Sequence, residues 1–204
     1  MNFKAIILAA GKGTRMKSKS PKVVHKVCGK EMVNHVIDIS NKAGVNDVVV
    51  ILGHGSETVK NVIPEKSIVV MQTEQLGTGH AVKMAKETIN DEDIIVVLCG
   101  DTPLIEKETL EKLFAYHLEN EYMATVLTTK VEDPTGYGRV IRDSEGNFEK
   151  IVEQKDANEE ELAVNEINSG IYCFKGDKLK EALVLLDNNI AHGEYFLTDT
   201  LKII

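Results

Sequence analysis

Three unbroken apolar runs limit what this chain can fold into more than any other feature of its sequence. They lie within residues 4–10, 47–52 and 93–99, and each follows one charged residue at the start of its range. None alternates polar with apolar side chains, a pattern typical of strands that are covered on both faces. Strands that alternate with helical segments predict βαβ units and an α/β fold with a mostly parallel sheet flanked by helices. The remaining segments of this alternation are a strand at 67–72 and helices at 32–43, 77–89 and 106–121.

The second half of the chain has a different pattern, with strand-like segments and few helices between them. We therefore expect a smaller antiparallel extension, and we expect 1–204 to be a single domain with two halves, 1–121 and 122–204. An apparent helix beginning near Thr198 reaches the end of the chain without a stop signal, so we expect a domain truncated at its C-terminus. The predicted segments are strands at 123–130, 138–142, 148–153 and 165–174, a hairpin turn at 143–147, an acidic loop or short helix at 155–162 and a helix at 178–186.

Composition excludes several classes of protein. The chain has 204 residues with 24 Lys and Arg against 32 Asp and Glu, and its formal net charge of −8 argues against general nucleic-acid binding. No apolar run has the length of a membrane span and the N-terminus lacks a cleavable signal pattern, so we expect no membrane association and a cytoplasmic location. Cys28, Cys99 and Cys173 are odd in number and far apart, and they predict neither a disulfide framework nor a zinc site.

The positive charge is concentrated near the N-terminus. Seven basic residues and no carboxylate lie between Lys12 and Lys30. A local cationic patch on an acidic protein indicates a small anionic ligand. The alternative interpretation is a solvated basic loop.

A glycine-rich loop opens this basic stretch, directly after the first strand. Residues 8–16 have the sequence LAAGKGTRM. Gly11 and Gly13 allow a close approach of a ligand to the backbone, and a turn of backbone N–H groups can hold phosphate oxygens. A P-loop and a dinucleotide-binding fingerprint both require glycine five positions after Gly11, where this chain has Met16. The loop is a phosphate-binding candidate of another class, and a turn that merely needs glycine is the alternative.

Seven motifs together resemble a known family. The loop, followed by Pro21 and Lys22, is similar to the signature of nucleoside-diphosphate-sugar pyrophosphorylases. The later motifs resemble the uridyltransferase domain of bacterial bifunctional N-acetylglucosamine-1-phosphate uridyltransferase / glucosamine-1-phosphate acetyltransferases, in that family's order and over nearly the whole chain. They are QTEQLGTGHA at 72–81, GDTPL at 100–104, DPTGYGR at 133–139, IVE at 151–153, EIN at 166–168 and GEY at 193–195.

The resemblance implies a Rossmann-like nucleotidyltransferase fold and a reaction. The first half of the chain, 1–121, would bind the nucleotide, and the second half, 122–204, would bind the sugar. The domain would transfer uridylyl from UTP to N-acetylglucosamine 1-phosphate, giving pyrophosphate and UDP-N-acetylglucosamine, a precursor of peptidoglycan and the cell envelope. The attacking phosphate is already largely ionised near neutral pH, so this transfer needs positioning and charge stabilisation more than a strong base.

The resemblance assigns the phosphate chemistry to a few residues. Arg15 would hold the departing pyrophosphate and Lys22 would contact the phosphates throughout, which makes these two the expected catalytic residues. Asp101 would bind Mg²⁺, because it follows an apolar strand at the edge where α/β sheets bind ligands and a carboxylate suits a hard cation. From local sequence alone, Asp101 could equally be a turn residue before Pro103.

Uridine recognition is assigned to backbone and side chains of the same half. Gln72 and the Gly77–Thr78 pair would recognise uracil, although Thr78 could also cap the following helix. His80 could face the ligand or only pack within the helix, and we assign it no catalytic role. The backbone beside the uridine would come from Leu8, Ala9, Ala10 and Gly11.

The sugar would be surrounded by Gly138, Glu153, Asn168 and Thr198. Glu153 can accept hydrogen bonds from hydroxyl groups, and Asn168 can both donate and accept. Taken alone, Glu153 would also fit an exposed charge at a strand end. Glu194 is a weaker candidate, because Phe196 stands where family members often carry a tyrosine.

Two other functions stay open at this point. One is a pyrophosphorylase for another sugar 1-phosphate, such as glucose 1-phosphate. The other is a module that binds UDP-N-acetylglucosamine but turns over poorly, because the family's second metal ligand, an asparagine, lies downstream of Ile204. Acetyl transfer is not expected, since the chain has no hexapeptide repeats. Full-length relatives are expected to form homotrimers, largely through their acetyltransferase half. This chain is not expected to contain that half, which leaves it free to be a monomer.

Overall fold

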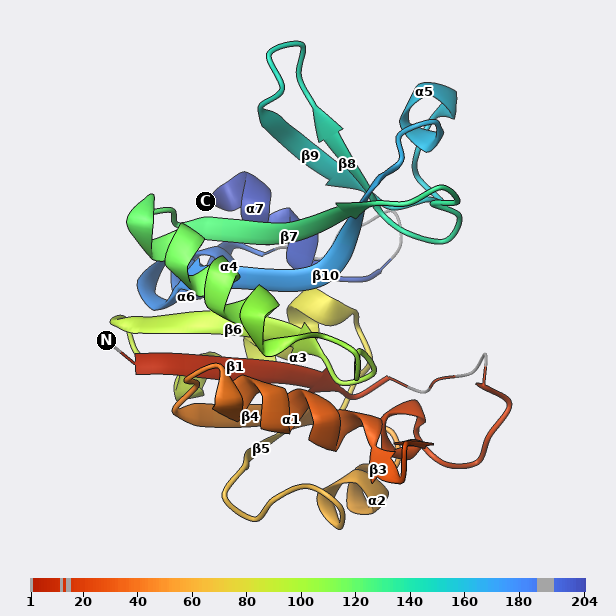
Figure 1. The fold of residues 1–204 in the computed structure, drawn as a ribbon, viewed down its shortest axis with the longest axis vertical. Helices are drawn as coiled ribbons and strands as arrows, with labels where there is room; N and C mark the ends of the chain where they lie inside the picture. The colour runs from red at the N-terminus through yellow and green to blue at the C-terminus, as the bar shows by residue number, and fades with distance from the viewer. Residues whose placement is uncertain (1, 12, 14–15, 187–192) are drawn as a thin grey trace. The chain divides into compact units, whose positions relative to one another are not determined.

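The computed structural model describes residues 2–11, 13, 16–186 and 193–204. The chain forms two compact units, one of Met1–Thr125 with Cys173–Ile204 and one of Val126–Tyr172. Figure 1 shows the helices and strands of each unit. No helix in the described ranges has both the length and the apolar character needed to cross a membrane.

The first unit is built on four parallel strands in the order β5 (Ile68–Met71), β4 (Asp47–Leu52), β1 (Asn2–Ala9) and β6 (Asp93–Cys99). Ile6, Val50 and Val97 are fully buried, as expected of strands covered on both faces. β5 is the outer strand, and its Ile68 is 41% exposed. Because the strands are parallel, their carboxyl ends all lie at one edge.

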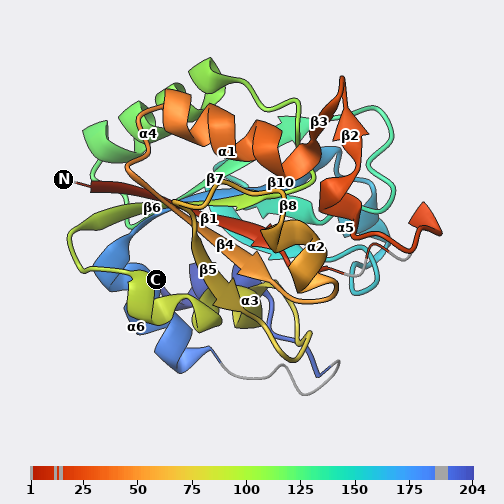
Figure 2. The same cartoon turned by 90° about the horizontal axis from the view of Figure 1, so that it is seen from below.

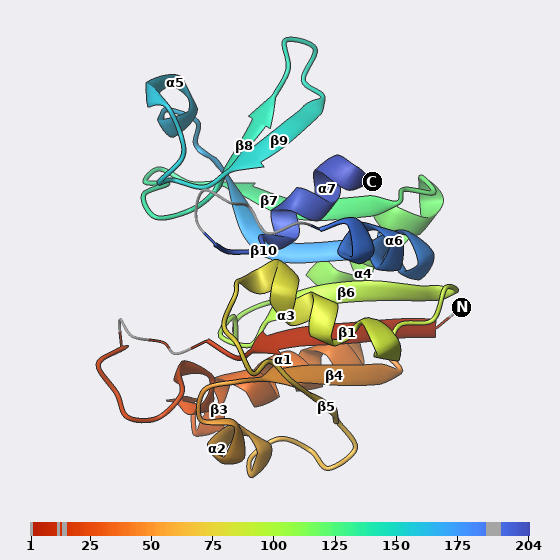
Figure 3. The ribbon, with the colours of Figure 1, turned by 180° about the vertical axis from the view of Figure 1, so that it is seen from behind.

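Helices cover both faces of these strands. α1 (Met32–Lys42) and α4 (Lys107–Glu119) lie on one face, and α3 (Thr78–Met84) and α6 (Gly176–Leu185) on the other (Figures 2 and 3). α1 turns Val33, Val36 and Ile37 to the core, the stripe its sequence spacing predicts. The smaller elements of this unit are α2 (Ser56–Lys60), α7 (Thr200–Ile203), the 3-10 turns η2 (Lys22–Val24), η3 (Lys86–Thr88) and η4 (Leu197–Asp199), and the antiparallel pair β2 (Lys26–Val27) and β3 (Lys30–Glu31).

A buried ion pair joins the amino ends of β1 and β6. Lys4 Nζ lies 2.8 Å from Asp93 Oδ2, with side chains 4% and 3% exposed. The amide of Asn2 and the backbone N–H of Asn90 also donate to Asp93, and Lys4 donates to the carbonyl of Thr88. Burial raises the pKa of Asp93, but the hydrogen bonds from Lys4, Asn90 and Asn2 and the charge of Lys4 bring it below its ordinary value.

The second unit is antiparallel. β8 (Arg139–Arg142) pairs with β9 (Phe148–Val152) and with β10 (Glu166–Lys175), which also pairs with β7 (Ala124–Lys130). The Asp143 carboxylate accepts the backbone N–H groups of Glu145 and Asn147, which confirms the predicted hairpin turn. α5 (Glu159–Leu162) begins with a capping box between Asn158 and Glu161.

The predicted fold class is confirmed, with a mostly parallel α/β core and an antiparallel extension. The two compact units are not the predicted halves. The chain leaves the first unit after Thr125 and returns at Cys173, so that Thr198 belongs to the first unit. The division into a nucleotide-binding 1–121 and a sugar-binding 122–204 stays a prediction about function.

Candidate functional site

The segments that follow the four parallel strands are held together by backbone hydrogen bonds. Gly100 N–H donates to the carbonyl of Leu8 (2.9 Å) and Gln72 N–H to that of Leu52 (2.7 Å). His54 N–H donates to the carbonyl of Ala10 (3.3 Å). Ligands of open α/β sheets bind beyond these carboxyl ends. The candidate site therefore begins with a compact set of backbone segments, one from each strand.

Glycines make this close approach possible. A Cβ on Gly53 would lie 2.9 Å from both the Cβ and the carbonyl oxygen of Ala10. Gly13 has φ +58°, and a Cβ there would lie 2.8 Å from Lys22 Cβ. Gly11 is different, because no described atom lies within 4 Å of a Cβ built on it. Among the described residues, the space next to the Gly11 Cα is thus open.

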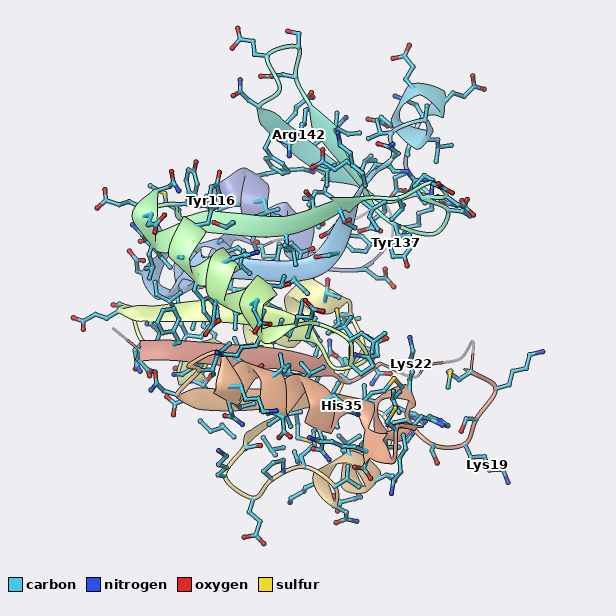
Figure 4. All side chains as sticks on the ribbon, in the orientation of Figure 1. Lys19, Lys22, His35, Tyr116, Tyr137 and Arg142 are labelled. Carbon is cyan, nitrogen blue, oxygen red and sulfur yellow. The ribbon has the colours of Figure 1, made fainter. Side chains whose placement is uncertain are left out.

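Lys22 and Asp101 form an ion pair at this edge. Lys22 Nζ lies 2.6 Å from Asp101 Oδ2, and the two side chains are 38% and 32% exposed. η2 presents Lys22 beyond the carboxyl end of β1 (Figure 4). Asp101 follows β6, with only Gly100 between them. The structure therefore brings the expected phosphate-binding lysine and the expected metal ligand together. Arg15, the other expected catalytic residue, lies outside the described residues.

The thiol of Cys99 lies next to this pair. Burial and the charge of Asp101 raise the pKa of Cys99 to about 11, with Lys22 acting in the opposite direction. Cys99 therefore stays a neutral thiol near pH 7 and is not suited to act as a nucleophile.

The carboxylate at Asp101 fits one kind of metal site and not another. Within the described ranges, no group of three or more His, Cys, Asp or Glu side chains could hold a metal ion. A closed protein cage is thus absent from this part of the chain. Mg²⁺ is commonly bound by one or two carboxylates together with substrate phosphates and water. Asp101 suits that mode of binding.

The basic stretch is partly neutralised by carboxylates from outside it. Lys26 pairs with Glu31 at 3.4 Å, and Lys30 pairs with Asp38. Together with Lys22–Asp101, these contacts account for three of the seven basic residues. The positive charge that faces a ligand is therefore smaller than the sequence count indicates.

Gln72 lies at the centre of a small hydrogen-bonded loop. Its side chain is almost fully buried, at 3% exposed. Its Nε2 donates to the carbonyl of Gly77 (3.0 Å) and lies 3.1 Å from His80 Nδ1. Gly77 has φ +97°, and a Cβ there would lie 2.4 Å from the carbonyl oxygen of Tyr195. Glycine is therefore required at position 77 by both conformation and space.

Thr78 and Thr198 are linked through neighbouring residues. Leu197 N–H donates to Thr78 Oγ1 (3.1 Å), and Thr198 is buried in η4. The expectation that Thr78 caps the following helix is wrong: α3 starts at Thr78 itself, and Gly77 occupies the N-cap. The hydroxyl instead binds a segment 119 positions away in the chain.

The other three expected sugar-binding residues lie together in the second unit. Asn168 N–H donates to the carbonyl of Gly138 (2.9 Å), and a Cβ on Gly138 would lie 3.5 and 3.6 Å from the two carboxylate oxygens of Glu153. Asn168 Nδ2 donates to the Tyr172 hydroxyl (2.6 Å), and its Oδ1 accepts from Gly170 N–H (3.0 Å). Asn168 therefore keeps only one N–H and one lone pair for a ligand.

An open pocket of about 580 Å³ lies beside Gln72. Of its six lining residues only Gln72 was expected at the site from the sequence, and the other five were not. The signal that could have found Gly53 and His54 is their place directly after β4, where a parallel sheet binds ligands. The pocket is lined by Gly53, His54, Met71, Gln72, Thr73 and Gln75.

A family model described as nucleotidyl transferase matches residues 4–204. The chain belongs to the nucleotidyl transferase family. The matched residues cover nearly all of both compact units and the motifs named from the sequence.

The most similar proteins include two bifunctional GlmU proteins. The chain is 73% identical over 203 residues to "Bifunctional protein GlmU" of Clostridioides difficile (strain 630), covering 100% of this chain and 44% of that protein. It is 58% identical over 204 residues to the GlmU of Alkaliphilus oremlandii (strain OhILAs), covering 100% and 45%. This nucleotidyl transferase chain thus spans less than half the length of these relatives. The resemblance inferred from its motifs is confirmed.

Two solved structures share the fold. A UDP-glucose pyrophosphorylase complexed with UDP-glucose superposes with a TM-score of 0.79 at 21% identity, covering 100% of this chain and 86% of that one. The apo form of UDP-glucose pyrophosphorylase gives a TM-score of 0.81 at 19% identity with the same coverage. At this identity the likeness supports the fold and no more.

Proposed function

We propose that this chain transfers uridylyl from UTP to N-acetylglucosamine 1-phosphate, releasing pyrophosphate and forming UDP-N-acetylglucosamine. The observation that carries the proposal is the half-exposed Lys22–Asp101 pair beside the glycine-rich loop, at the carboxyl edge of a parallel sheet. It is supported by 73% identity to a GlmU protein across the whole chain. The product would serve peptidoglycan and cell-envelope synthesis in the cytoplasm, where UTP is available.

The phosphate chemistry would be divided between Lys22, Arg15 and Asp101. Lys22 would hold the phosphates of UTP during transfer, and Arg15 the leaving pyrophosphate. Such cations stabilise the charge that develops as the bond to the α-phosphorus changes. Asp101 would hold Mg²⁺, which when bound neutralises phosphate charge and orients the reacting groups. Lys22 donates to Oδ2 of Asp101, and Oδ1 of the same carboxylate would be the oxygen that binds the cation.

The two substrates would be recognised by different kinds of group. Gln72, Gly77 and Thr78 would bind uracil beside the backbone of Leu8–Gly11. Glu153 and Asn168 would bind sugar hydroxyl and N-acetyl groups next to Gly138, and Thr198 would add a hydroxyl. The internal hydrogen bonds of Asn168 to Tyr172 and Gly170 support a fixed orientation for its side chain, which favours recognition of a single sugar.

The test is a parallel product assay. Purified chain is incubated with UTP, Mg²⁺ and either N-acetylglucosamine 1-phosphate or glucose 1-phosphate, and pyrophosphate and UDP-sugar are measured. We expect at least about tenfold preference for the N-acetyl sugar in kcat/KM, and binding of UDP-N-acetylglucosamine even if turnover is slow. Preference for glucose 1-phosphate would support the other pyrophosphorylase instead. Failure to bind any uridine nucleotide would refute both.

A further inference from the structure

The orientation of the Gln72 amide follows from chemistry alone. The carbonyl oxygen of Gly77 can only accept a hydrogen bond, so the Gln72 atom 3.0 Å away must be the amide nitrogen. The same nitrogen lies 3.1 Å from Nδ1 of His80. An NH₂ group donates twice, so Nδ1 must be the acceptor of the second hydrogen. In this arrangement Nδ1 of His80 therefore carries no proton.

This orientation decides what Gln72 can offer a ligand. With both amide hydrogens directed to Gly77 and His80, the carbonyl oxygen Oε1 is the group left to meet a base. Gln72 lines the pocket beside the strand ends. Uracil presents an N3–H donor at its pairing edge, whereas cytosine presents an N3 acceptor there. A fixed Oε1 therefore favours uracil and repels cytosine.

His80 is itself held in place. Its ring packs on the Tyr195 ring with centroids 5.9 Å apart, and Lys83 Nζ lies 5.5 Å from the centroid of the same Tyr195 ring. Tyr195 N–H donates to the carbonyl of Leu76, and Gly79 N–H donates to that of Tyr195, both at 2.8 Å. The backbone just before His80 is thus fastened to Tyr195, and Nδ1 of the imidazole lies within hydrogen-bond distance of Gln72.

We propose that His80 is a positioning residue that sets the preference for uracil over cytosine by locking the amide of Gln72. The inference rests on the proposed function, which assigns uracil recognition to Gln72. This role involves no contact between His80 and the reacting phosphates. It acts by making the flipped amide unfavourable, because a flip would place Oε1 against the carbonyl of Gly77 and take the donor away from Nδ1.

Three variants separate positioning from packing. His80→Leu introduces an apolar side chain of similar volume and removes the acceptor. His80→Asn restores an acceptor, since its amide oxygen can occupy the place of Nδ1. His35→Leu is the matched control, because His35 lies on α1 and is also half-buried, with one hydrogen-bond contact to the backbone of Val27 (2.8 Å) (Figure 4). Folding of each variant is checked by circular dichroism and thermal unfolding.

The readouts are binding of UMP and CMP by calorimetry and kcat/KM for UTP and CTP. We expect His80→Leu to lower the UMP-to-CMP affinity ratio about three- to tenfold, the effect of one lost hydrogen bond. The loss should appear as a raised KM for UTP with kcat within about twofold, because the base does not react. His80→Asn should recover most of the ratio, and His35→Leu should leave it unchanged.

Two results would overturn the role of His80. One is a His80→Leu chain that folds and weakens UMP and CMP binding equally, and the other is identical behaviour of the Leu and Asn variants. If the parent chain prefers UMP over CMP and His80→Leu has the same preference, the positioning role of His80 is refuted and the proposed function is unaffected. A parent chain that binds neither UMP nor UDP-N-acetylglucosamine would remove the proposed function and this role with it.

Discussion

Two lysine–aspartate pairs lie at opposite ends of the same two strands. They have the same ionic groups but differ in burial and in their surrounding hydrogen bonds. At the amino ends of β1 and β6, Lys4 and Asp93 are about 97% buried, with additional hydrogen bonds to each partner. Beyond the carboxyl ends, Lys22 and Asp101 keep about a third of their side chains exposed. The first pair is surrounded by protein groups, and the second can meet solvent or a ligand.

Burial separates the pair that stabilises this sheet from the pair that a ligand can reach. A buried ion pair is costly to break, because removing one partner leaves an uncompensated charge in the interior. A half-exposed pair adds little to stability, since solvent screens it and the side chains lose conformational freedom. The sequence carries Lys and Asp at both ends, and burial decides which pair supports the fold and which is free for chemistry.

The largest effect is expected from Lys4→Met. The substitution leaves Asp93 buried without its cation, so the free energy of unfolding should fall by about 3–5 kcal/mol. Urea unfolding followed by circular dichroism measures it. The double variant Lys4→Met, Asp93→Leu is the control and should lose less, because no charge is left in the interior. A loss below about 1 kcal/mol in Lys4→Met would mean that the pair is not structural.

Lys22→Gln should have the reverse signature. Nucleotidyl transfer should fall about 10²–10³-fold, the cost of removing one stabilising group from a transition state, while the free energy of unfolding changes by less than about 1 kcal/mol. Steady-state kinetics and urea unfolding on one preparation provide both values. A variant that is unstable but fully active per folded molecule would assign Lys22 to the fold instead.

The contribution of the Lys4–Asp93 pair to stability should depend on pH through the carboxylate of Asp93. Its pKa is lowered in the folded chain from an ordinary value of 3.8, so its stabilising contribution is present above that pH and is lost as the pH falls below it. The stability difference between the parent and Asp93→Asn should therefore be constant from pH 7 to about 5 and shrink in more acidic solution. Urea unfolding at a series of pH values tests this. A difference that grows on acidification would contradict the sign.

The smallest effect is expected from Lys26→Gln, which removes the same charge from the same basic stretch. Lys26 is 61% exposed and pairs with Glu31 at 3.4 Å, so stability should change by less than about 1 kcal/mol. Activity should stay within about twofold, because Lys26 has no place at the strand ends. A large loss of activity would show that total positive charge, rather than the position of Lys22, binds the phosphates.

The sequence predicts those helices and strands that are determined by residues close together in the chain. β4 and β6 were predicted at their observed bounds, because their apolar runs are long and continuous. The five-residue helix α2 was missed, since Val59 is its one buried residue and gives no periodic signal. The helix expected at 77–89 is divided into α3 and η3.

Contacts between distant residues could not be read from the sequence. The motifs marked Lys22 and Asp101 separately, but their pairing spans 79 positions. The carboxylates Glu31 and Asp38 that neutralise part of the basic stretch lie just outside it. The sequence assigns His80 no role, because its function as a hydrogen-bond acceptor depends on the orientation of the Gln72 side-chain amide.

If burial divides the two pairs into a structural one and a functional one, stability and metal-dependent binding should respond separately in two matched variants. Asp101→Asn and Asp93→Asn are compared by calorimetric titration with UDP-N-acetylglucosamine, with and without Mg²⁺, and by urea unfolding. We predict that Asp101→Asn loses the Mg²⁺-dependent part of the affinity and keeps its stability within about 1 kcal/mol. Asp93→Asn should be destabilised yet keep Mg²⁺-dependent binding when folded. Unchanged Mg²⁺-dependent binding in Asp101→Asn would show that Asp101 does not hold the metal ion.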